Sequence, residues 1–228
     1  MTPTRQPAIT ARDVELILHD IATTLVPDRG LNERYVHHAF SHRLQAQFSC
    51  LDLAAPHQTL LLHPEWPTCK KSTGVAYAKY RKTNGCYVPL DVTGDDRGAG
   101  FIDFAIGPYA KPEIAIEFCL KYGWPDEAVT YDFLKVLDAR NPFGAGFSHT
   151  VILRDNNFTA GANRHDLQNH INSALHKAIE RLSGIGCADS RDVRVLVSEI
   201  ATHERTHWHY DPATRGFMEG LGCSNDAK

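Results

Sequence analysis

The chain has 228 residues, of which 43% are hydrophobic and 22% charged, and its formal net charge is −3. These values are typical of one globular domain with a sizeable core, and a nucleic-acid surface would have to be a local basic patch. No apolar run is long enough to cross a bilayer and no signal peptide is evident, so we expect a cytoplasmic protein without a membrane partner.

The first part of the chain is predicted to begin with two helices. Residues 13–25 repeat apolar positions at helical spacing, and residues 31–48 follow with Asn32 as the N-cap. Prolines make residues 56–74 irregular. Strands are then expected at 74–82, 86–92, 100–106 and 113–121, with 93–100 as a hairpin turn between the second and the third.

The second half of the chain is predicted to alternate helices and strands. Helices are expected at 126–140 and 164–184, and strands at 149–154 and 193–200, with 205–218 pairing back on the last one. This order predicts a central mixed β-sheet flanked by helices, an α/β or α+β fold. We expect a single domain over 1–228, with an N-terminal helical extension (1–30), a core (31–155), and a C-terminal helix and strands that complete the sheet (156–228).

Two expected strands each carry an acid near their centre, Asp103 and Glu117. Strand side chains alternate between faces, so Glu117 shares one face with Lys121, and Asp103 lies opposite an apolar face formed by Ile102, Phe104 and Ile106. If the two strands pair, both carboxylates converge, and a hard divalent cation would offset their repulsion. Solvated acids on an open sheet face explain the same pattern.

Asp103 in "GFIDFAI" and Glu117 in "EIAIEFCLK" resemble the motif of the PD-(D/E)XK nuclease superfamily, the restriction-endonuclease-like fold. The resemblance covers roughly residues 30–155, and the helix at 126–140 and the strand "VILR" fall where that core has them. The segment "LNERYVHHAF" resembles the N-terminal core helix of the family, which in some members supplies another acid, here Glu33. Cys119 occupies the position of the motif lysine, and Lys121 lies on the same face one residue pair further on.

The resemblance implies a metal-dependent nuclease that hydrolyses phosphodiester bonds of DNA, or of RNA. Asp103, Glu117 and the carbonyl of Phe118 would bind Mg²⁺, for which Mn²⁺ can substitute, while Lys121 would orient water and Glu33 would support the site. Such enzymes often act as dimers, so a homodimer or a partner subunit is expected. The alternative is a catalytically degenerate module that binds nucleic acid or a partner protein.

Residues 70–82 form a basic segment without an acid. Its cations are Lys70, Lys71, Lys79, Arg81 and Lys82, and tyrosines alternate with them. Lysine and arginine neutralise phosphates and tyrosines stack on bases, so this segment is a candidate nucleic-acid-binding strip. A solvated edge strand protected by lysines is the alternative.

The segment "HERTH", His203 to His207, matches the HExxH zinc pattern through His203, Glu204 and His207. That chemistry requires a helix, whereas the motif follows an alternating strand, so a zinc hydrolase is the less favoured hypothesis. A hairpin with surface histidines is expected instead, in which His207 and His209 could bind a metal adventitiously. The helical histidines at 37, 38 and 42 are predicted to be surface or packing residues.

Overall fold

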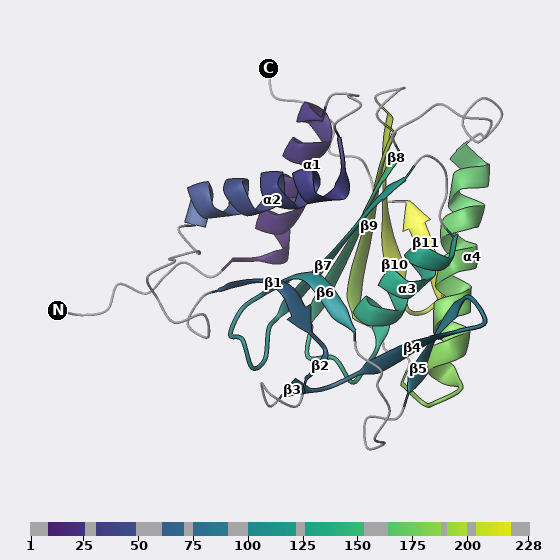
Figure 1. Cartoon of the computed structure of the whole chain (residues 1–228). Coiled ribbons are helices and arrows are strands. Elements are labelled where there is room, and N and C mark those ends of the chain that lie inside the picture. Colours follow the sequence, from purple (N-terminus) through teal and green to yellow (C-terminus); the bar gives the residue numbers. More distant parts are fainter. Residues whose placement is uncertain are drawn as a thin grey trace.

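The structure is a computed structural model, and it describes residues 9–25, 31–48, 61–70, 75–90, 100–121, 126–152, 164–187, 191–199 and 204–219. A seven-stranded sheet with the order β1-β6-β7-β8-β9-β10-β11 forms the centre (Figure 1). Its strands are β1 (Leu62–Pro67), β6 (Phe101–Ile106), β7 (Ile114–Lys121), β8 (Ala145–Ile152), β9 (Asp192–Glu199), β10 (Glu204–Asp211) and β11 (Gly216–Glu219). The middle strands β7, β8 and β9 are parallel, and the pairs on either side of them are antiparallel.

Helices cover both faces of this sheet (Figure 1). One face carries α1 (Ala11–Thr24) and α2 (Glu33–Phe48), and the other carries α3 (Asp126–Leu137) and α4 (Arg164–Ser183). The prediction of a mixed sheet flanked by helices is therefore confirmed. Within the described ranges, no helix combines the length and the apolar character needed to cross a bilayer.

Local signals explain where the helices begin and end. Thr10 and Asp13 form a reciprocal capping box at the start of α1, and Oδ1 of Asn32 accepts the amide of Tyr35 at 3.1 Å, as expected for an N-cap. Helix α3 stops at Leu137, earlier than predicted. The Asp138 carboxylate accepts the backbone amide of Arg140 at 3.0 Å, which offers the chain a turn in place of a further helical residue.

Strand β1 lies in a region that the sequence predicted to be irregular. It contains Pro64 and Pro67, which cannot donate a backbone hydrogen bond. Proline is tolerated on an edge strand, and β1 is the edge of the large sheet. The prolines therefore indicated an edge position instead of a loop.

The predicted hairpin between 86–92 and 100–106 is wrong. Strand β5 (Cys86–Leu90) pairs with β4 (Lys79–Thr83) in a separate two-stranded sheet, and β6 pairs with β1 and β7. A second small sheet joins β2 (Cys69–Lys70) to β3 (Val75–Ala76), so the expected strand 74–82 is split. Asn84 and Gly85 both have positive φ angles, as a two-residue hairpin turn requires, and this Asn-Gly pair is the signal that the prediction overlooked.

The pairing of β1 with β6 is irregular at Glu65, opposite Asp103. Glu65 has a φ angle of 49°, and pairing between the two strands is interrupted at this position. Beyond it, Ile102 packs in the core under α3 and α4, whereas Phe104 packs under α1 and α2. The expectation of one apolar face for β6 is therefore wrong, because Ile102 and Phe104 pack on opposite sides of the sheet.

Candidate active site

Asp103 lies in a gap between β6 and β7. Backbone pairing between these strands ends at Phe104 and Ile116. Two residues further along β7, the amide of Phe118 donates a hydrogen bond to Oδ2 of Asp103 at 2.7 Å. The side chain thus replaces a backbone partner, and its residual exposure of 18% keeps it accessible from solvent. The structure brings Asp103 to β7, the strand that carries Glu117.

Glu33, in the first turn of α2, binds the same edge of β7. Its Oε2 accepts the amide of Leu120 at 3.2 Å. The amides of Phe118 and Leu120 are two residues apart, so they point to the same edge of the strand. Two carboxylates from separate elements therefore accept from backbone donors that no strand within the described ranges pairs with.

The carbonyl of Phe118 faces this same gap. In a strand, the N–H and the C=O of one residue point to the same edge, because paired residues exchange both groups with one partner. The amide of Phe118 points at Asp103, so its carbonyl oxygen lies on that side as well. This position is compatible with the predicted role of the carbonyl as an additional oxygen ligand.

Glu117 lies beneath α3 and is only 1% exposed. The Nζ atom of Lys135 approaches its Oε1 to 2.6 Å, and the same Nζ donates to the carbonyl of Phe101 at 3.0 Å. Asp132, one turn earlier on α3, is 3.5 Å from Lys135. Neither helical residue was predicted as part of a site. Their only signal was an acid and a lysine at i, i+3 in the apolar run "YDFLKVL".

The buried charges perturb one another strongly. Burial raises the pKa of Glu117 well above its usual value, with Asp103 and Asp132 adding to the effect, although Lys135 opposes it. Burial likewise raises the pKa of Asp132 to about 7. Burial alone would lower the pKa of Lys135, but Glu117 and Asp132 hold it above its usual value, so this lysine stays protonated. The cluster carries more acid than its one ammonium can neutralise.

His37 is a packing residue, as predicted, and it also belongs to this site. Its ring packs on Phe104 and Phe118, and its Nε2 is 3.5 Å from Oδ2 of Asp103. Burial opposes protonation, but Asp103, Glu33 and Glu65 together outweigh it, so the pKa of His37 is raised. Burial would also raise the pKa of Asp103, yet His37, Lys135 and the Phe118 amide together lower it.

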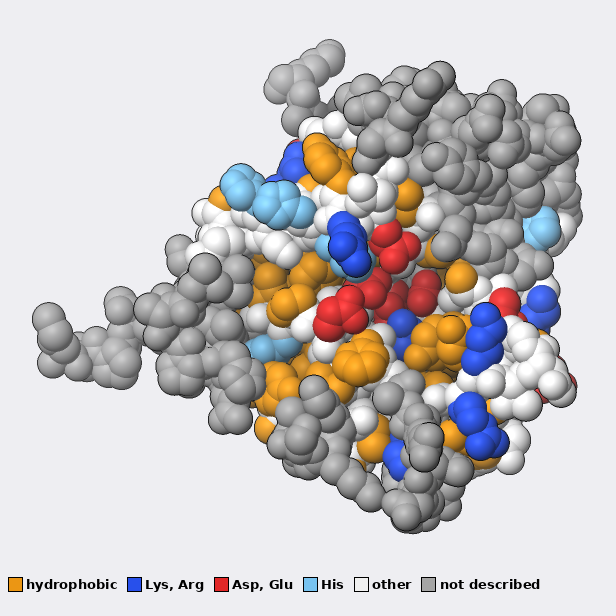
Figure 2. All heavy atoms as spheres, viewed as in Figure 1, with side chains coloured by type: hydrophobic (Ala, Val, Ile, Leu, Met, Phe, Trp, Pro, Cys, Tyr) orange, Lys and Arg blue, Asp and Glu red, His pale blue; other side chains and the backbone are white. Residues whose placement is uncertain are grey.

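Acidic side chains gather near the middle of the face shown in Figure 2, between α2 and α3 of Figure 1. The groups that act on His37 include Glu33, Glu65 and Asp103. Of these, Glu65 is exposed and the other two are partly exposed. The acidic cluster therefore reaches the surface, whereas Glu117 and Lys135 form its floor.

The predicted role of Lys121 as the catalytic lysine is not tested by the structure. Lys121 is the last residue of β7, and its side chain lies outside the described residues. Cys119, at the position of the motif lysine, is 3% exposed and packs in the core under α3. The ammonium beside Glu117 comes instead from α3, through Lys135.

The basic strip is only partly as predicted. Lys79 is 5% exposed, so its assignment to a solvent-facing strip is wrong. Tyr80 next to it is buried too, because it packs in the hydrophobic core at this end of strand β4. Arg81 and Lys82 are exposed, while the side chain of Lys70 and all of Lys71 lie outside the described residues.

A chain of ring contacts joins this hairpin to the acidic cluster. The Nζ atom of Lys82 lies 5.4 Å from the ring centre of Tyr87, which stacks on Tyr131 at 3.8 Å. Tyr131 in turn lies 4.5 Å from the Nζ atom of Lys135. The exposed base Lys82 is therefore connected to Glu117 through two tyrosines and one buried lysine.

The HExxH hypothesis is wrong in its geometry. His207 lies on strand β10 and not on the helix that the zinc motif requires, while His203 and the side chain of Glu204 fall outside the described residues. His207 is also not a surface histidine, since it is 7% exposed. Burial, with His209 nearby, lowers its pKa to about 4.

A groove of about 640 Å³ lies elsewhere, between α1 and α2. The charged groups Asp20 and Arg43 in its lining are bonded to each other, so the groove offers no free charged group for chemistry. The acidic cluster at β6 and β7 is a better candidate, because its charges are buried and incompletely compensated.

No family model, curated protein or solved structure matches this chain. Its function is therefore inferred from the geometry and the electrostatics of the cluster.

Proposed function

We propose that the chain is a Mg²⁺-dependent nuclease with a restriction-endonuclease-like core. The observation that carries this proposal is the meeting of Asp103, Glu117 and Lys135, which come from two neighbouring strands and from the following helix. Two carboxylates and one ammonium are the charged groups that such hydrolysis needs. Lys135 supplies the positive charge that Cys119 does not provide at the motif position.

The donors of the cluster suit a hard divalent cation. Asp103 and Glu117 offer carboxylate oxygens, and the Phe118 carbonyl faces the same gap. Lys135 lies 2.6 Å from Oε1 of Glu117, and a carboxylate oxygen has two lone pairs, so Oε1 keeps acceptor capacity for a further contact. A cation would offset the cost of keeping Glu117 and Asp132 ionised in a buried position.

Each residue has a distinct role in the proposed reaction. When bound, Mg²⁺ would supply an activated water and would stabilise charge on the phosphate. Asp103 and Glu117 hold the cation, and the Phe118 amide fixes the orientation of the Asp103 carboxylate. Lys135 stays protonated, so it orients water and stabilises negative charge in the transition state instead of acting as a base. Glu33 is a supporting acid, fixed by the Leu120 amide.

The hairpin of β4 and β5 is the proposed contact with the nucleic-acid backbone. Arg81 and Lys82 are exposed on it, and Tyr87 and Tyr131 connect it to Lys135. Basic side chains next to an acidic metal site suit a phosphodiester, because they attract the phosphates that the acids alone would repel. We propose DNA as the substrate and RNA as the alternative.

The test compares cleavage of DNA and RNA in Mg²⁺ or Mn²⁺ by the wild type and by Asp103→Asn and Glu117→Gln. These variants preserve the side-chain shapes and remove the charges. We expect a loss of cleavage of at least about 100-fold in each, with unchanged circular dichroism. Glu180→Gln, an exposed acid on α4, is the matched control and should cleave like the wild type.

Metal titration separates an enzyme from a non-catalytic module. Calorimetry should detect Mn²⁺ binding to the wild type and its loss in Asp103→Asn. Wild-type cleavage by both site variants would refute the nuclease proposal. If the wild type cleaves no substrate and binds no metal through Asp103, the chain is a degenerate module, and Arg81 and Lys82 would then contribute to nucleic-acid binding alone.

A further inference from the structure

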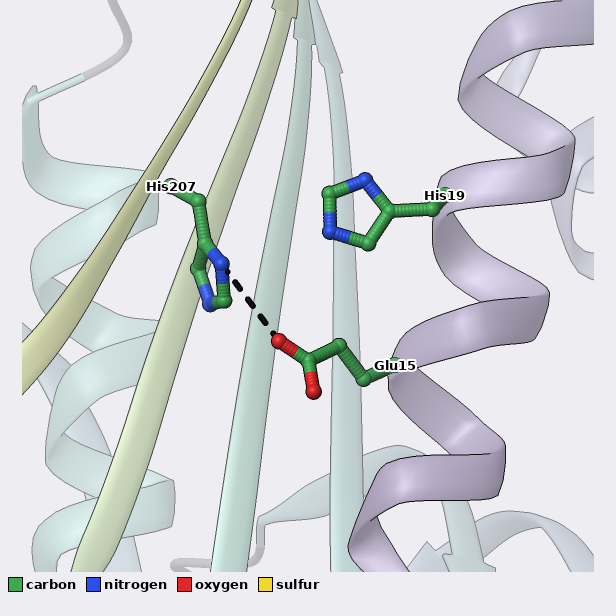
Figure 3. A group of neighbouring side chains, drawn as sticks. All are labelled: Glu15, His19 and His207. Atoms are coloured by element: carbon green, nitrogen blue, oxygen red, sulfur yellow. Dashed lines mark ion pairs between the residues drawn. The ribbon is translucent and has the colours of Figure 1, made fainter. Parts of the chain in front are cut away.

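A second group of potential metal ligands lies on the far side of α1 from the α2 groove, between α1 and the sheet. Glu15 and His19 are one turn apart on α1, at i and i+4, so they share a helix face. Figure 3 shows both side chains directed at His207, which points back from β10. The three residues come from opposite ends of the chain and meet only in the folded protein.

The distances in this group suit one small ion. One ligand atom from each of Glu15, His19 and His207 lies within 4.8 Å of the others. Oε1 of Glu15 is 3.4 Å from Nδ1 of His207. Ligand atoms of a tetrahedral Zn²⁺ are about 3.3 Å apart, so this pair is already at binding distance and the third ligand needs only a small side-chain rotation.

A cavity between the same side chains provides an independent observation. Its volume is about 10 Å³, and its lining includes Glu15, His19 and His207. That volume is close to the minimum for one water molecule. The space between the ligands is thus of the size that a single ion occupies.

We propose that Glu15, His19 and His207 form a structural Zn²⁺ site that joins α1 to strand β10 of the sheet. Two imidazoles and one carboxylate favour Zn²⁺ over Mg²⁺, which prefers oxygen ligands. Water completes the coordination, or His209, whose ring centre is 4.5 Å from that of His207.

Two guanidinium groups next to Glu15 limit the affinity of this site but do not block it. Arg12 and Arg194 contact Oε2 at 2.9 and 2.8 Å, whereas His207 faces Oε1. The guanidinium of Arg194 also pairs with Asp192 at 2.8 Å, which reduces its effect on an ion. The arginines hold the carboxylate in place through Oε2, and Oε1 remains directed at the histidines.

The experiment titrates Zn²⁺ into the chelator-treated full chain, with Co²⁺ as a spectroscopic probe. We expect one strong site per chain, a higher Tm with Zn²⁺, and a Co²⁺ spectrum typical of tetrahedral nitrogen and oxygen ligands. His19→Gln and His207→Gln should each weaken Zn²⁺ binding by at least about 10-fold and abolish the rise in Tm. Since His19 is half-buried, its variant should fold even if that of His207 does not.

Two controls make the result specific. His42→Gln removes an exposed histidine that pairs with His38 on α2, a competing surface site, and it should bind Zn²⁺ like the wild type. Asp103→Asn should also leave Zn²⁺ binding unchanged, so this site is tested separately from the proposed nuclease site. Unchanged Zn²⁺ affinity in His19→Gln, or no Zn²⁺ binding to the wild type, would overturn the proposal.

Discussion

The Nζ atom of Lys135 lies 2.6 Å from Oε1 of Glu117, deep beneath α3. This contact places a protonated amine beside the strand residue that the sequence marked as a metal ligand. If Lys135 stabilises the transition state, Lys135→Met should lower the turnover of the proposed nuclease by about 100–1000-fold. Binding of Mn²⁺ should persist, because both carboxylates remain, and the comparison of single-turnover rates with metal calorimetry checks this split.

The matched control for that variant is Lys111→Met, which removes an exposed lysine between β6 and β7. Lys121→Ala should also retain activity, since Lys135 already occupies the position beside Glu117. Adding Cys119→Lys to Lys135→Met should restore part of the rate, because Cys119 packs on the α3 side of β7, where Glu117 also lies. Full activity of Lys135→Met would assign the lysine role elsewhere.

The β4–β5 hairpin should determine salt-dependent affinity for nucleic acid. Lys82→Ala is expected to weaken DNA binding and to reduce the slope of log K against log salt by about 1, the value for one lost phosphate contact. Fluorescence anisotropy at several salt concentrations measures both quantities, with Lys111→Ala as the control. An unchanged slope would exclude Lys82 from the interface.

Tyr80 holds a buried polar network between β4 and the end of α3. Its hydroxyl donates to Asp138 at 3.0 Å and accepts from Asn141 at 3.1 Å. Burial, with Asp138 beside it, raises the pKa of Tyr80, so the hydroxyl remains a donor. Tyr80→Phe should lower the free energy of unfolding by about 1–2 kcal/mol, because Asp138 and Asn141 each lose a partner in the interior.

Chemical denaturation measures that loss. Tyr35→Phe provides the control, since its side chain is 56% exposed and lies on the outer face of α2. A stability change in Tyr80→Phe no larger than in Tyr35→Phe would mean that water replaces the missing hydroxyl.

Gly146 allows α3 to pack closely on β8. A Cβ atom at this position would lie 2.8 Å from Cβ of Val136, which is fully buried. Gly146→Ala should therefore lower the free energy of unfolding by about 1–3 kcal/mol through overpacking. The double variant with Val136→Ala should lose less than the sum of the two single variants, because the smaller helix residue makes room.

Denaturant titration of the three variants tests the coupling. Gly216→Ala serves as a comparison, since the nearest atom to its added Cβ is 3.7 Å away. Additive losses in the double variant would show that Gly146 and Val136 do not share the strain.

The sequence by itself determined most of the elements and two residues of the candidate site. Alternation in the strands located β6, β7 and β9, and the side-chain oxygen of Asn32 marked the start of α2. These signals are local, because strand periodicity and helix capping involve residues only a few positions apart. Asp103 and Glu117 stood out for the same reason, as acids inside short apolar runs.

Only the tertiary structure decided which charges meet those acids. Lys135 lies within an apolar helix face, and nothing in its local pattern says that this face covers Glu117 instead of another part of the sheet. The partners Asp103 and His37, and likewise Glu15 and His207, belong to separate elements whose contacts depend on strand order and twist. Buried charges are stable only beside partners that the whole fold brings to them, so their pairing is a property of the packed structure.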